Sequence, residues 1–365
     1  RGGVIKQAGL INVGNTPTMI VNEAGRITIS SNHYIATSES QTLASAENQG
    51  GKISIDATKT AVLEGGAVMK ASATMSGDGG NISITSGEQL ALGGNIEANG
   101  ANEGNGGIIT THSPNVISVA SSLAVFAKAG LNRIDENEGS WTHTANQHYI
   151  DTNTAEIISN TLDHASVMLV AQAGDIVIPS DVNVIKKSSN SPKTSLRIMS
   201  SASTSILGSI SNNEATDLSV QLSALSTITL GSSAFIRAAE VSFEAERDIN
   251  VLGDIYVYGS NNSSPLARFM GANVALMGAI YGGRQDSKSS TVRAHASKFL
   301  STGPKSRIQL MGRDAQLNLS SEHGLVIEGS TIQSNACNGR GGTYTINALE
   351  DILISNATIS SNASE

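Results

Sequence analysis

The stretch GGKISIDATKTAVLEGGAVMKA, residues 50–71, is followed by a second version of itself, GGNISITSGEQLALGGNIEANG, residues 79–100. The two versions share isoleucine pairs and glycine pairs at matching places: Ile53 and Ile55 with Ile82 and Ile84, and Gly65 and Gly66 with Gly93 and Gly94. A unit of this length, made of short alternating strands and glycine turns, cannot bury its apolar side chains alone. It must stack on copies of itself, which makes the chain a repeat protein.

Further copies extend the pattern in both directions. AGRITIS places Ile27 and Ile29 26 residues before Ile53 and Ile55. Later copies are looser in length and include GDIVIPSDVNVI, RDINVLGDIYV and EDILISNATIS. Each is a short strand, a corner of glycine, serine or asparagine, and another short strand. Because the phrase repeats in one direction and hairpin signals are scarce, we predict an all-β fold, a right-handed parallel β-helix with turns of about 25 residues.

The composition also favours strands. Of the 365 residues, 39% are hydrophobic but only 3% are aromatic, and Ile, Val, Leu and Ala alternate with single small polar residues. Such alternation is typical of β-strands, and the hydrophobic content is too high for a disordered tract.

Charge and length of apolar runs bear on the partners. The formal net charge is -8 and the chain has no basic block, which argues against nucleic acid and anionic membranes as partners. No apolar run approaches ~18 residues, so no membrane insertion is expected. The single cysteine, Cys337, excludes an internal disulfide.

Three segments of one continuous solenoid can be distinguished along the chain. Residues 1–129 carry regular repeats, residues 130–164 form an irregular excursion outside the helix, and residues 165–365 resume the repeats. The excursion holds the only tryptophan of the chain and three of its seven histidines. Arg1 lies in mid-repeat, and we interpret the chain as an internal or processed piece of a longer protein.

One segment, GDGGNISITSGEQLALGGNIEANGANEGNGGIITTHSPNVISV, residues 77–119, resembles a known family. It is similar to the filamentous-haemagglutinin-like exoproteins, the TpsA type, which Gram-negative bacteria export by two-partner secretion. The glycine pairs at 79–80, 93–94 and 106–107 and the Pro114-Asn115-Val116 segment occupy the matching positions. Residues 157–224 resemble the section that follows in that family. The amino-terminal secretion domain of the family, with its asparagine-proline motifs, has no counterpart in this sequence.

The resemblance implies an extracellular or cell-surface location and a function in surface attachment or cell–cell contact, as an adhesin or structural rod without enzymatic activity. Its implied partners are a host or cell-surface protein or glycan, an outer-membrane transporter during export, and other copies of itself in filaments. A first alternative is a module on the same scaffold that binds a host protein or a haem carrier. A second alternative is a polysaccharide-active β-helix enzyme.

An enzyme of that kind needs clustered carboxylates on one exposed strand face. The strongest cluster lies in EVSFEAERDINVLGD, where Glu240, Glu244 and Glu246 point outward while Val241 and Phe243 point inward. We interpret this row as a solvated strand face. The spacing of the histidines does not predict a metal site, and no nucleotide or cofactor fingerprint is present. We therefore predict no catalytic, cofactor-binding or metal-binding residues.

Contact with a partner is predicted at two places. Loops on a rigid scaffold often carry binding residues, and Trp and Tyr are favoured contact residues. The candidates on the excursion are Trp141, His143, His148 and Tyr149, and those around a long Asn/Ser corner are Tyr256, Tyr258 and Arg268. The alternative for the excursion is that it packs against the solenoid, with Trp141 covering an apolar strip.

Overall fold

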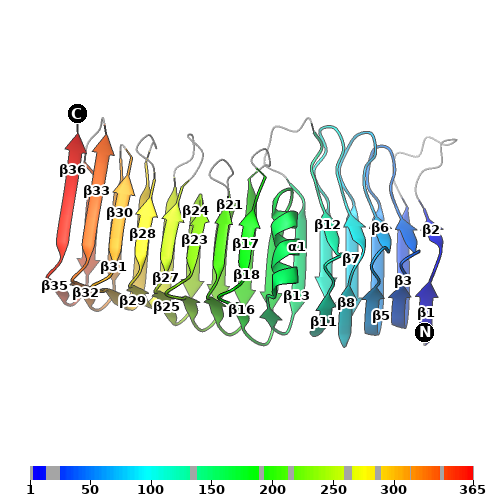
Figure 1. The fold of residues 1–365 in the computed structure, drawn as a ribbon, viewed down its shortest axis with the longest axis horizontal. Coiled ribbons are helices and arrows are strands. Elements are labelled where there is room, and N and C mark those ends of the chain that lie inside the picture. Colours follow the sequence, from blue (N-terminus) through cyan, green and yellow to red (C-terminus); the bar gives the residue numbers. More distant parts are fainter. Residues whose placement is uncertain are drawn as a thin grey trace. The chain divides into compact units, whose positions relative to one another are not determined.

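The computed structural model describes residues 3–13, 25–131, 138–188, 193–212, 218–258, 265–283, 289–312, 314–337 and 341–364. The chain divides into two compact units. Unit 1 comprises Arg1–His148, Thr152–Ala173 and Ser191–Leu196, and unit 2 comprises Tyr149–Asp151, Gly174–Asn190 and Arg197–Glu365. Each unit is a stack of coils whose strands pair in parallel with the next coil, so the predicted parallel β-helix is confirmed (Figure 1). Each coil is called a rung below.

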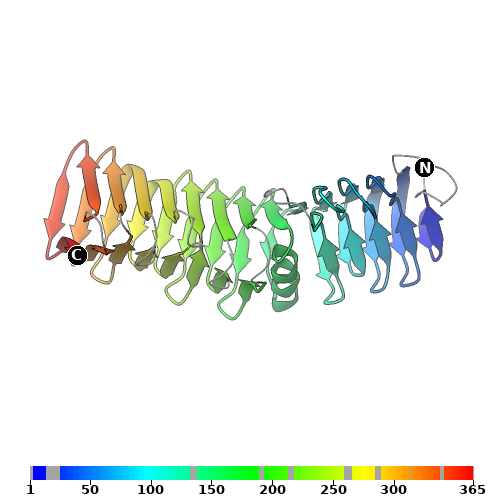
Figure 2. The same cartoon turned by 90° about the horizontal axis from the view of Figure 1, so that it is seen from above.

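Three faces of stacked strands build unit 1 (Figure 2). The first face holds β3 (Arg26–Ala36), β5 (Lys52–Leu63), β7 (Asn81–Ser86), β10 (Ile108–His112), β13 (Ser140–Ala145) and β15 (Ser166–Ala171). The second holds β1 (Val4–Gln7), the later halves of β3 and β5, β8 (Gln89–Leu92) and β11 (Asn115–Val119). The third holds β2 (Leu10–Asn12), β4 (Gln41–Leu43), β6 (Val68–Lys70), β9 (Asn95–Glu97) and β12 (Ala124–Phe126).

The doubled phrase of the sequence becomes a ladder in the interior of unit 1. Ile27 pairs with Ile53 and Ile53 with Ile82, and all three are at most 5% exposed. Burial of each isoleucine side chain stabilises the fold by about 1.5–3 kcal/mol. The turns before β6 and β9 require Gly66 and Gly94, whose φ angles of 97° and 76° are in the left-handed region.

Unit 2 has the same three-faced plan. Its first face holds β21 (Leu218–Ala224), β24 (Glu240–Ala245), β27 (Leu266–Leu276), β29 (Thr291–Thr302), β31 (Gln316–Ser321) and β34 (Thr343–Ala348). The second holds β16 (Ile176–Ile178), β19 (Thr204–Ile206), β22 (Ile228–Leu230), β25 (Asp248–Val251), the later halves of β27 and β29, β32 (Leu325–Glu328) and β35 (Ile352–Ser355). The third holds β17 (Asn183–Lys186), β20 (Ser209–Asn212), β23 (Phe235–Ala238), β26 (Asp254–Val257), β28 (Ala279–Gly282), β30 (Arg307–Met311), β33 (Thr331–Cys337) and β36 (Thr358–Ser364).

The core of unit 2 follows from strict alternation along its short strands. Ile176 and Ile178 are buried while Val177 between them is half-buried, as the sequence predicts. On the neighbouring face Phe243 and Phe269 of adjacent rungs pack edge to face, with ring centroids 5.4 Å apart. Such aromatic pairs add about 0.5–1.5 kcal/mol beyond the area they bury.

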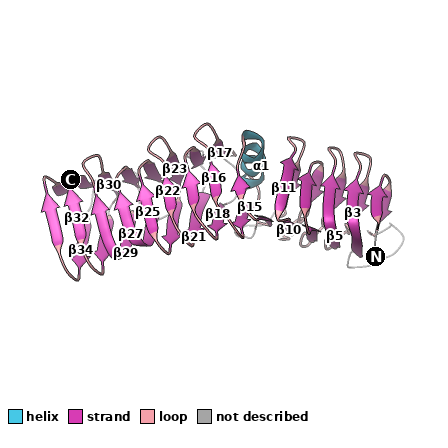
Figure 3. Cartoon of the chain, turned by 90° about the horizontal axis from the view of Figure 1, so that it is seen from below, coloured by secondary structure: helices cyan, strands magenta, loops and turns pink. Residues whose placement is uncertain are grey.

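The structure corrects the expectation of a loop-like excursion over residues 130–164. Residues 132–137 lie outside the described part. β13 pairs in parallel with β10 on one side and β15 on the other, so it is an ordinary strand of its rung. The departure from the β pattern is the helix α1 (Thr152–Leu162), drawn in cyan in Figure 3, which contacts β12 and β15. Two further strands, β14 (His148–Tyr149) and β18 (Thr194–Ser200), contain residues of both units.

Helix α1 packs into its rung instead of projecting from it. Its side chains Ala155, Ile158 and Leu162 are at most 1% exposed. The buried hydroxyls of Ser159 and Thr161 each donate to the carbonyl four residues earlier, at 2.6 and 2.8 Å, so they leave no unsatisfied donor. The helix therefore supplies core side chains to unit 1, in agreement with the packing alternative given for this segment.

Candidate binding groove

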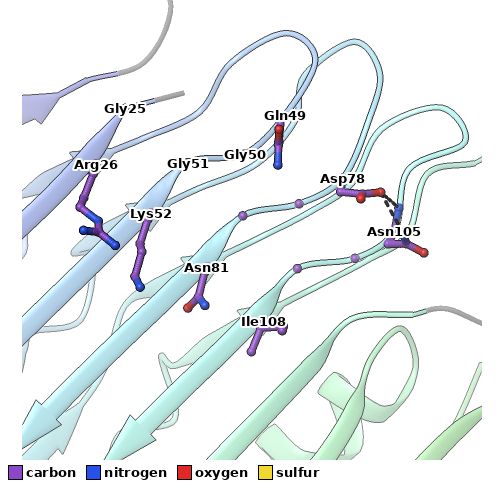
Figure 4. Close-up of a pocket in the computed structure, with 14 residues that line it drawn as sticks. Gly25, Arg26, Gln49, Gly50, Gly51, Lys52, Asp78, Asn81, Asn105 and Ile108 are labelled. Atoms are coloured by element: carbon purple, nitrogen blue, oxygen red, sulfur yellow. Dashed lines mark hydrogen bonds between the residues drawn. The ribbon is translucent and has the colours of Figure 1, made fainter. Parts of the chain in front are cut away.

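A polar groove of about 530 Å³ runs across four successive rungs of unit 1 (Figure 4). It is lined by residues 25–26, 49–52, 78–81 and 105–108, which are the glycine corners and the first strand residue after each corner. At the ~4.8 Å spacing of neighbouring strands, four rungs span about 14 Å along the stack. The groove is thus long enough for a few residues of an extended polymer.

Backbone packing explains why its floor consists of glycine. The N–H groups of Gly51, Gly80 and Gly107 each donate at 2.7 Å to the carbonyls of Ala44, Ala71 and Ala98 respectively. A Cβ on Gly79 would overlap with Ala98 O, and one on Gly80 would overlap with Gly51 O. Only glycine allows the corners to stack this closely, and the absence of side chains leaves backbone exposed along the groove.

One rim of the groove is a row of side chains in register. The Cα of Arg26 lies opposite that of Lys52, Lys52 opposite Asn81, and Asn81 opposite Ile108. Figure 4 shows these four side chains on the same side of the corners. Arg26 is exposed, Lys52 and Asn81 are half-buried, and Ile108 is 51% exposed. The positively charged side chains of Arg26 and Lys52 therefore lie on neighbouring rungs.

Neither cation is neutralised by a side chain of the described residues. Within the described part of the chain, the side chains of Arg26 and Lys52 make no ion pair and no hydrogen bond. Like charges directly opposite one another on neighbouring strands are destabilising. The pair thus raises the local positive potential at a cost in stability, with no compensating partner among the residues that the structure describes.

The opposite rim carries a carboxylate in a fixed position. Asp78 Oδ1 accepts hydrogen bonds from the backbone N–H of Asn105 at 2.7 Å and from Asn105 Nδ2 at 2.9 Å. These bonds are dashed in Figure 4. Among the described residues, Asp78 Oδ2 receives no hydrogen bond, so it can accept one from a ligand. The groove thus has donors on one rim and an acceptor on the other.

Sequence reasoning missed these rim residues, although a signal for them exists. Aligning the copies AGR, GGK, GGN and GGI shows that Arg26, Lys52, Asn81 and Ile108 all follow a corner glycine directly. In a parallel stack, equivalent positions of successive copies lie side by side. The alignment alone could have predicted one outward row with two cations.

The structure overturns the expectation that Trp141, His143 and His148 offer side chains to a partner. Trp141 is 0% exposed, His143 2% and His148 7%. Trp141 takes the inward position that Ile109 and Val167 hold on the adjacent rungs. Inward positions alternate along β13, so Trp141 and His143 point to the same side and into the core.

These interior residues form a hydrogen-bonded and stacked cluster. Trp141 Nε1 donates to Thr111 Oγ1 at 3.0 Å, and His143 Nδ1 lies 2.7 Å from the same oxygen. The His143 ring contacts the His148 ring with centroids 5.1 Å apart, and His148 Nε2 lies 3.0 Å from Val170 O. Desolvation by burial, followed by the nearby His148, lowers the pKa of His143 to about 3. Desolvation also lowers the pKa of His148. Both rings are therefore neutral at pH 7.

The remaining predicted contact residues belong to unit 2 and are not all together. Tyr149 is 71% exposed. Tyr256 and Tyr258 lie on the third face with ring centroids 6.1 Å apart. Arg268 lies on β27, in a different sheet, where its guanidinium contacts Met270 Sδ. The structure thus brings the two tyrosines together and separates Arg268 from them.

Tyr256 belongs to a row of stacked side chains that the sequence reading did not assemble. Its ring is parallel to that of Tyr281 within 8°, at a centroid distance of 5.0 Å, and the Arg237 guanidinium lies 5.6 Å from its centroid. The Phe235 ring lies nearly perpendicular to the Tyr256 ring, with centroids 6.5 Å apart. Tyr256 thus contacts Arg237 and Tyr281 of the two neighbouring rungs.

Of the three acidic residues predicted to form a solvated strand face, Glu244 and Glu246 are exposed and Glu240 is half-buried. Val241 and Phe243 are buried, and Glu244 is exposed. Glu244 lies opposite Ser223 on one neighbouring strand and Met270 on the other, so no second carboxylate faces it there. Within the described residues, no group of three or more His, Cys, Asp or Glu side chains is arranged to hold a metal ion.

Comparisons with protein-family models, curated proteins and solved structures gave no match for this chain. Among the described residues, no helix has the length and apolar character needed to cross a membrane.

Proposed function

We propose that this chain is the β-solenoid part of a secreted or cell-surface exoprotein that attaches a Gram-negative bacterium to a surface or to another cell. The groove on unit 1 is the observation that carries the proposal. It crosses four rungs, and its floor consists of the same glycine pairs, at 79–80 and 106–107, on which the resemblance to filamentous-haemagglutinin-like exoproteins rests. A groove that runs along a repetitive stack suits an extended partner.

Attachment is favoured over catalysis by the chemistry of the groove. Glycoside hydrolysis canonically uses two carboxyl groups on either side of the scissile bond. Among the described residues that line the groove, Asp78 is the one carboxylate, and its Oδ1 already accepts two hydrogen bonds from Asn105. The cations of the opposite rim and the glycine floor provide binding groups. A polysaccharide-active enzyme is the alternative function, and an assay for polysaccharide cleavage distinguishes it from attachment.

The export route and the partners follow from the same proposal. A two-partner exoprotein passes an outer-membrane transporter, meets a host or cell-surface glycan or protein outside, and associates with its own copies in filaments. For the haem-carrier or host-protein module, the exposed Tyr149 and Arg268 and the half-buried Tyr256 and Tyr258 stay as candidate contact residues.

Location and attachment can be tested in the source organism. Intact cells that express the full-length protein are treated with protease and then fractionated, and a deletion strain is compared with its complemented strain in attachment to host cells and to glass. We expect protease-sensitive protein at the surface or in the medium, and weaker attachment of the deletion strain. Protein confined to the cytoplasm, with unchanged attachment, would refute the proposal.

The enzyme alternative needs its own assay. Purified chain is incubated with neutral and acidic polysaccharides, and the release of reducing ends is followed over time. We expect none above the level of a heat-denatured sample. A sustained release that disappears on Asp78→Asn would replace the attachment function by polysaccharide cleavage.

A further inference from the structure

We propose that Asn105, on the rim of the groove, is a site of spontaneous deamidation, and that the reaction places a second carboxylate beside Asp78. Asparagine is a labile residue, and a following glycine favours the reaction, because the backbone nitrogen of a residue without a Cβ attacks the side-chain amide with little steric hindrance. The inference concerns a covalent change in the chain itself, so it does not depend on the attachment function.

The chain offers its own comparison between susceptible and protected sites. The sequence Asn-Gly occurs at three places, 99–100, 105–106 and 338–339. The third lies outside the described residues. The four residues of the first two sites are all half-buried, so exposure to solvent does not distinguish these sites. Their hydrogen bonds do.

The site at Asn99 and Gly100 is held by the next rung. Gly100 N donates to Lys128 O at 2.8 Å, and Asn99 Oδ1 accepts a hydrogen bond from Lys128 N at 2.9 Å. The first bond restrains the nitrogen that would attack, and the second restrains the amide that it would attack. Both bonds must break before Gly100 N can reach Asn99 Cγ, which protects this site.

The corner at Gly106 lacks these restraints. On the two preceding rungs the first glycine of each pair donates to the following rung, Gly50 N to Asp78 O and Gly79 N to Asn105 O, both at 2.9 Å. Among the described residues Gly106 N donates no hydrogen bond, so this ladder stops at the nitrogen that would attack. In the same part of the chain, Asn105 Oδ1 is buried without a hydrogen-bond partner. The side chain is held through Nδ2, which donates to Asp78 Oδ1 at 2.9 Å (Figure 4).

The reaction consumes water and no other co-reactant. Gly106 N attacks Asn105 Cγ, so that the N–Cγ bond forms and the Cγ–Nδ2 bond breaks, and ammonia leaves with the proton of Gly106 N. Water then opens the cyclic succinimide. Opening at the side-chain carbonyl gives aspartate, and opening at the backbone carbonyl gives isoaspartate. Asparagine and water are thus converted to aspartate or isoaspartate and ammonia.

The product changes the rim of the groove. Asn105 Nδ2 donates to Asp78 Oδ1, whereas an aspartate at position 105 has no donor at this place and carries a negative charge. Two carboxylates in contact repel one another. Isoaspartate also lengthens the main chain at a corner where Gly104 and Gly106 leave no space for a Cβ. Deamidation should therefore weaken the contact between these two rungs and lower the positive potential of the groove.

The test follows both sites in one sample. The purified chain is incubated in mildly alkaline buffer well below its melting temperature, and peptide mapping by mass spectrometry gives the fraction converted at Asn99 and at Asn105 over time. A second sample is incubated unfolded in urea. In the folded chain Asn105 should convert at least about tenfold faster than Asn99, since breaking both hydrogen bonds of Lys128 slows the reaction by about that factor. In urea the two sites should convert at similar rates.

Two variants test the effect on the rim. Asn105→Asp carries the product and should melt about 2–4 °C below the wild type, because it loses the bond to Asp78 and gains the repulsion. Asn99→Asp is the matched control. Its side chain still accepts the hydrogen bond from Lys128 N, so its melting temperature should equal that of the wild type.

Equal rates at the two sites of the folded chain, or faster conversion of Asn99, would overturn the inference. A preference for Asn105 that persists in urea would also overturn it, since the preference would then come from the local sequence and not from the corner. The same holds if Asn105 stays intact in the folded chain while the unfolded chain reacts. An Asn105→Asp variant as stable as the wild type would refute the effect on the rim.

Discussion

The hydroxyl oxygen of Thr111 lies 2.7 Å from Nδ1 of His143, across two adjacent rungs in the core of unit 1. Thr111 Oγ1 also accepts the Trp141 indole N–H at 3.0 Å, and it lies 3.4 Å from Thr142 O, to which it can donate. One threonine hydroxyl thereby contacts both the indole N–H of Trp141 and Nδ1 of the neutral His143 among the aliphatic residues of the core.

This relationship predicts that Trp141 is a stability residue. Trp141→Ala removes a fully buried ring and one hydrogen bond, and should lower the free energy of unfolding by about 3–5 kcal/mol. Tyr149→Ala, at a side chain that is 71% exposed, should change it by no more than about 0.5 kcal/mol. Urea unfolding followed by tyrosine fluorescence and circular dichroism measures both. Equal stability of the two variants would contradict the buried position of Trp141.

The same cluster predicts a loss of stability in mild acid. The pKa of His143 is lowered to about 3 in the folded chain, against an ordinary value of about 6.5 when unfolded. Between these values the unfolded state binds more protons than the folded state, so the free energy of unfolding falls as pH falls. Above pH ~6.5 His143 is neutral in both states and does not reduce the free energy of unfolding. At pH 5 the protonation of His143 in the unfolded state alone should lower the free energy of unfolding by about 2 kcal/mol.

Burial lowers the pKa of His148 and His164 as well, so they act in the same direction. The side chains that act electrostatically on the pKa of His143 are those of His148 and His112, and both lower it. The measurement is the urea midpoint between pH 8 and pH 5 for the wild type and for His143→Gln, which cannot titrate. The variant should show a shallower dependence on pH. Parallel curves would show that His143 does not titrate in the buried environment described here.

The interior ladders could be predicted from the sequence because the same residue types recur at the same spacing. Ile53 and Ile82 are adjacent in register, as their place in the two copies predicts. β13 escaped prediction for a physical reason. Its inward positions hold Trp141 and His143, and Thr111 lies opposite His143, so the alternation of apolar and polar residues that marks a strand is hidden there.

The groove was missed for a different reason. Corner glycines were recognised as backbone positions, but a groove depends on the side chains that adjacent rungs place next to one another. Arg26 and Lys52 are 26 residues apart in the sequence and become neighbours only through stacking. The contact between Tyr256 and Tyr281 likewise arises from register between rungs, which sequence spacing alone specifies only where the repeat length is constant.

The glycine corners predict a sharp positional contrast within unit 1. Gly79→Ala places a methyl group against Ala98 O and the Gly107 backbone, and should destabilise the chain by about 1–3 kcal/mol or more. Gly9→Ala meets no heavy atom within 4 Å and should be within about 0.5 kcal/mol of the wild type. Thermal unfolding of the two variants gives the comparison. A neutral Gly79→Ala would mean that the corners stack less closely than described.

The stacked row on unit 2 predicts a measurable coupling between Tyr256 and Tyr281. Their rings are nearly parallel, with centroids 5.0 Å apart, and a contact of this kind adds about 0.5–1.5 kcal/mol beyond the area buried. A double-mutant cycle with Tyr256→Ala and Tyr281→Ala isolates that energy, because the separate losses of each ring cancel.

The control cycle pairs Tyr256→Ala with Tyr344→Ala. Tyr344 lies on a later rung of unit 2, where its hydroxyl donates to Ser360 O at 2.6 Å. We expect coupling in the first cycle and additivity within about 0.3–0.5 kcal/mol in the second, as for distant sites. Additivity in both cycles would show that the contact between the rings of Tyr256 and Tyr281 contributes no measurable stacking energy.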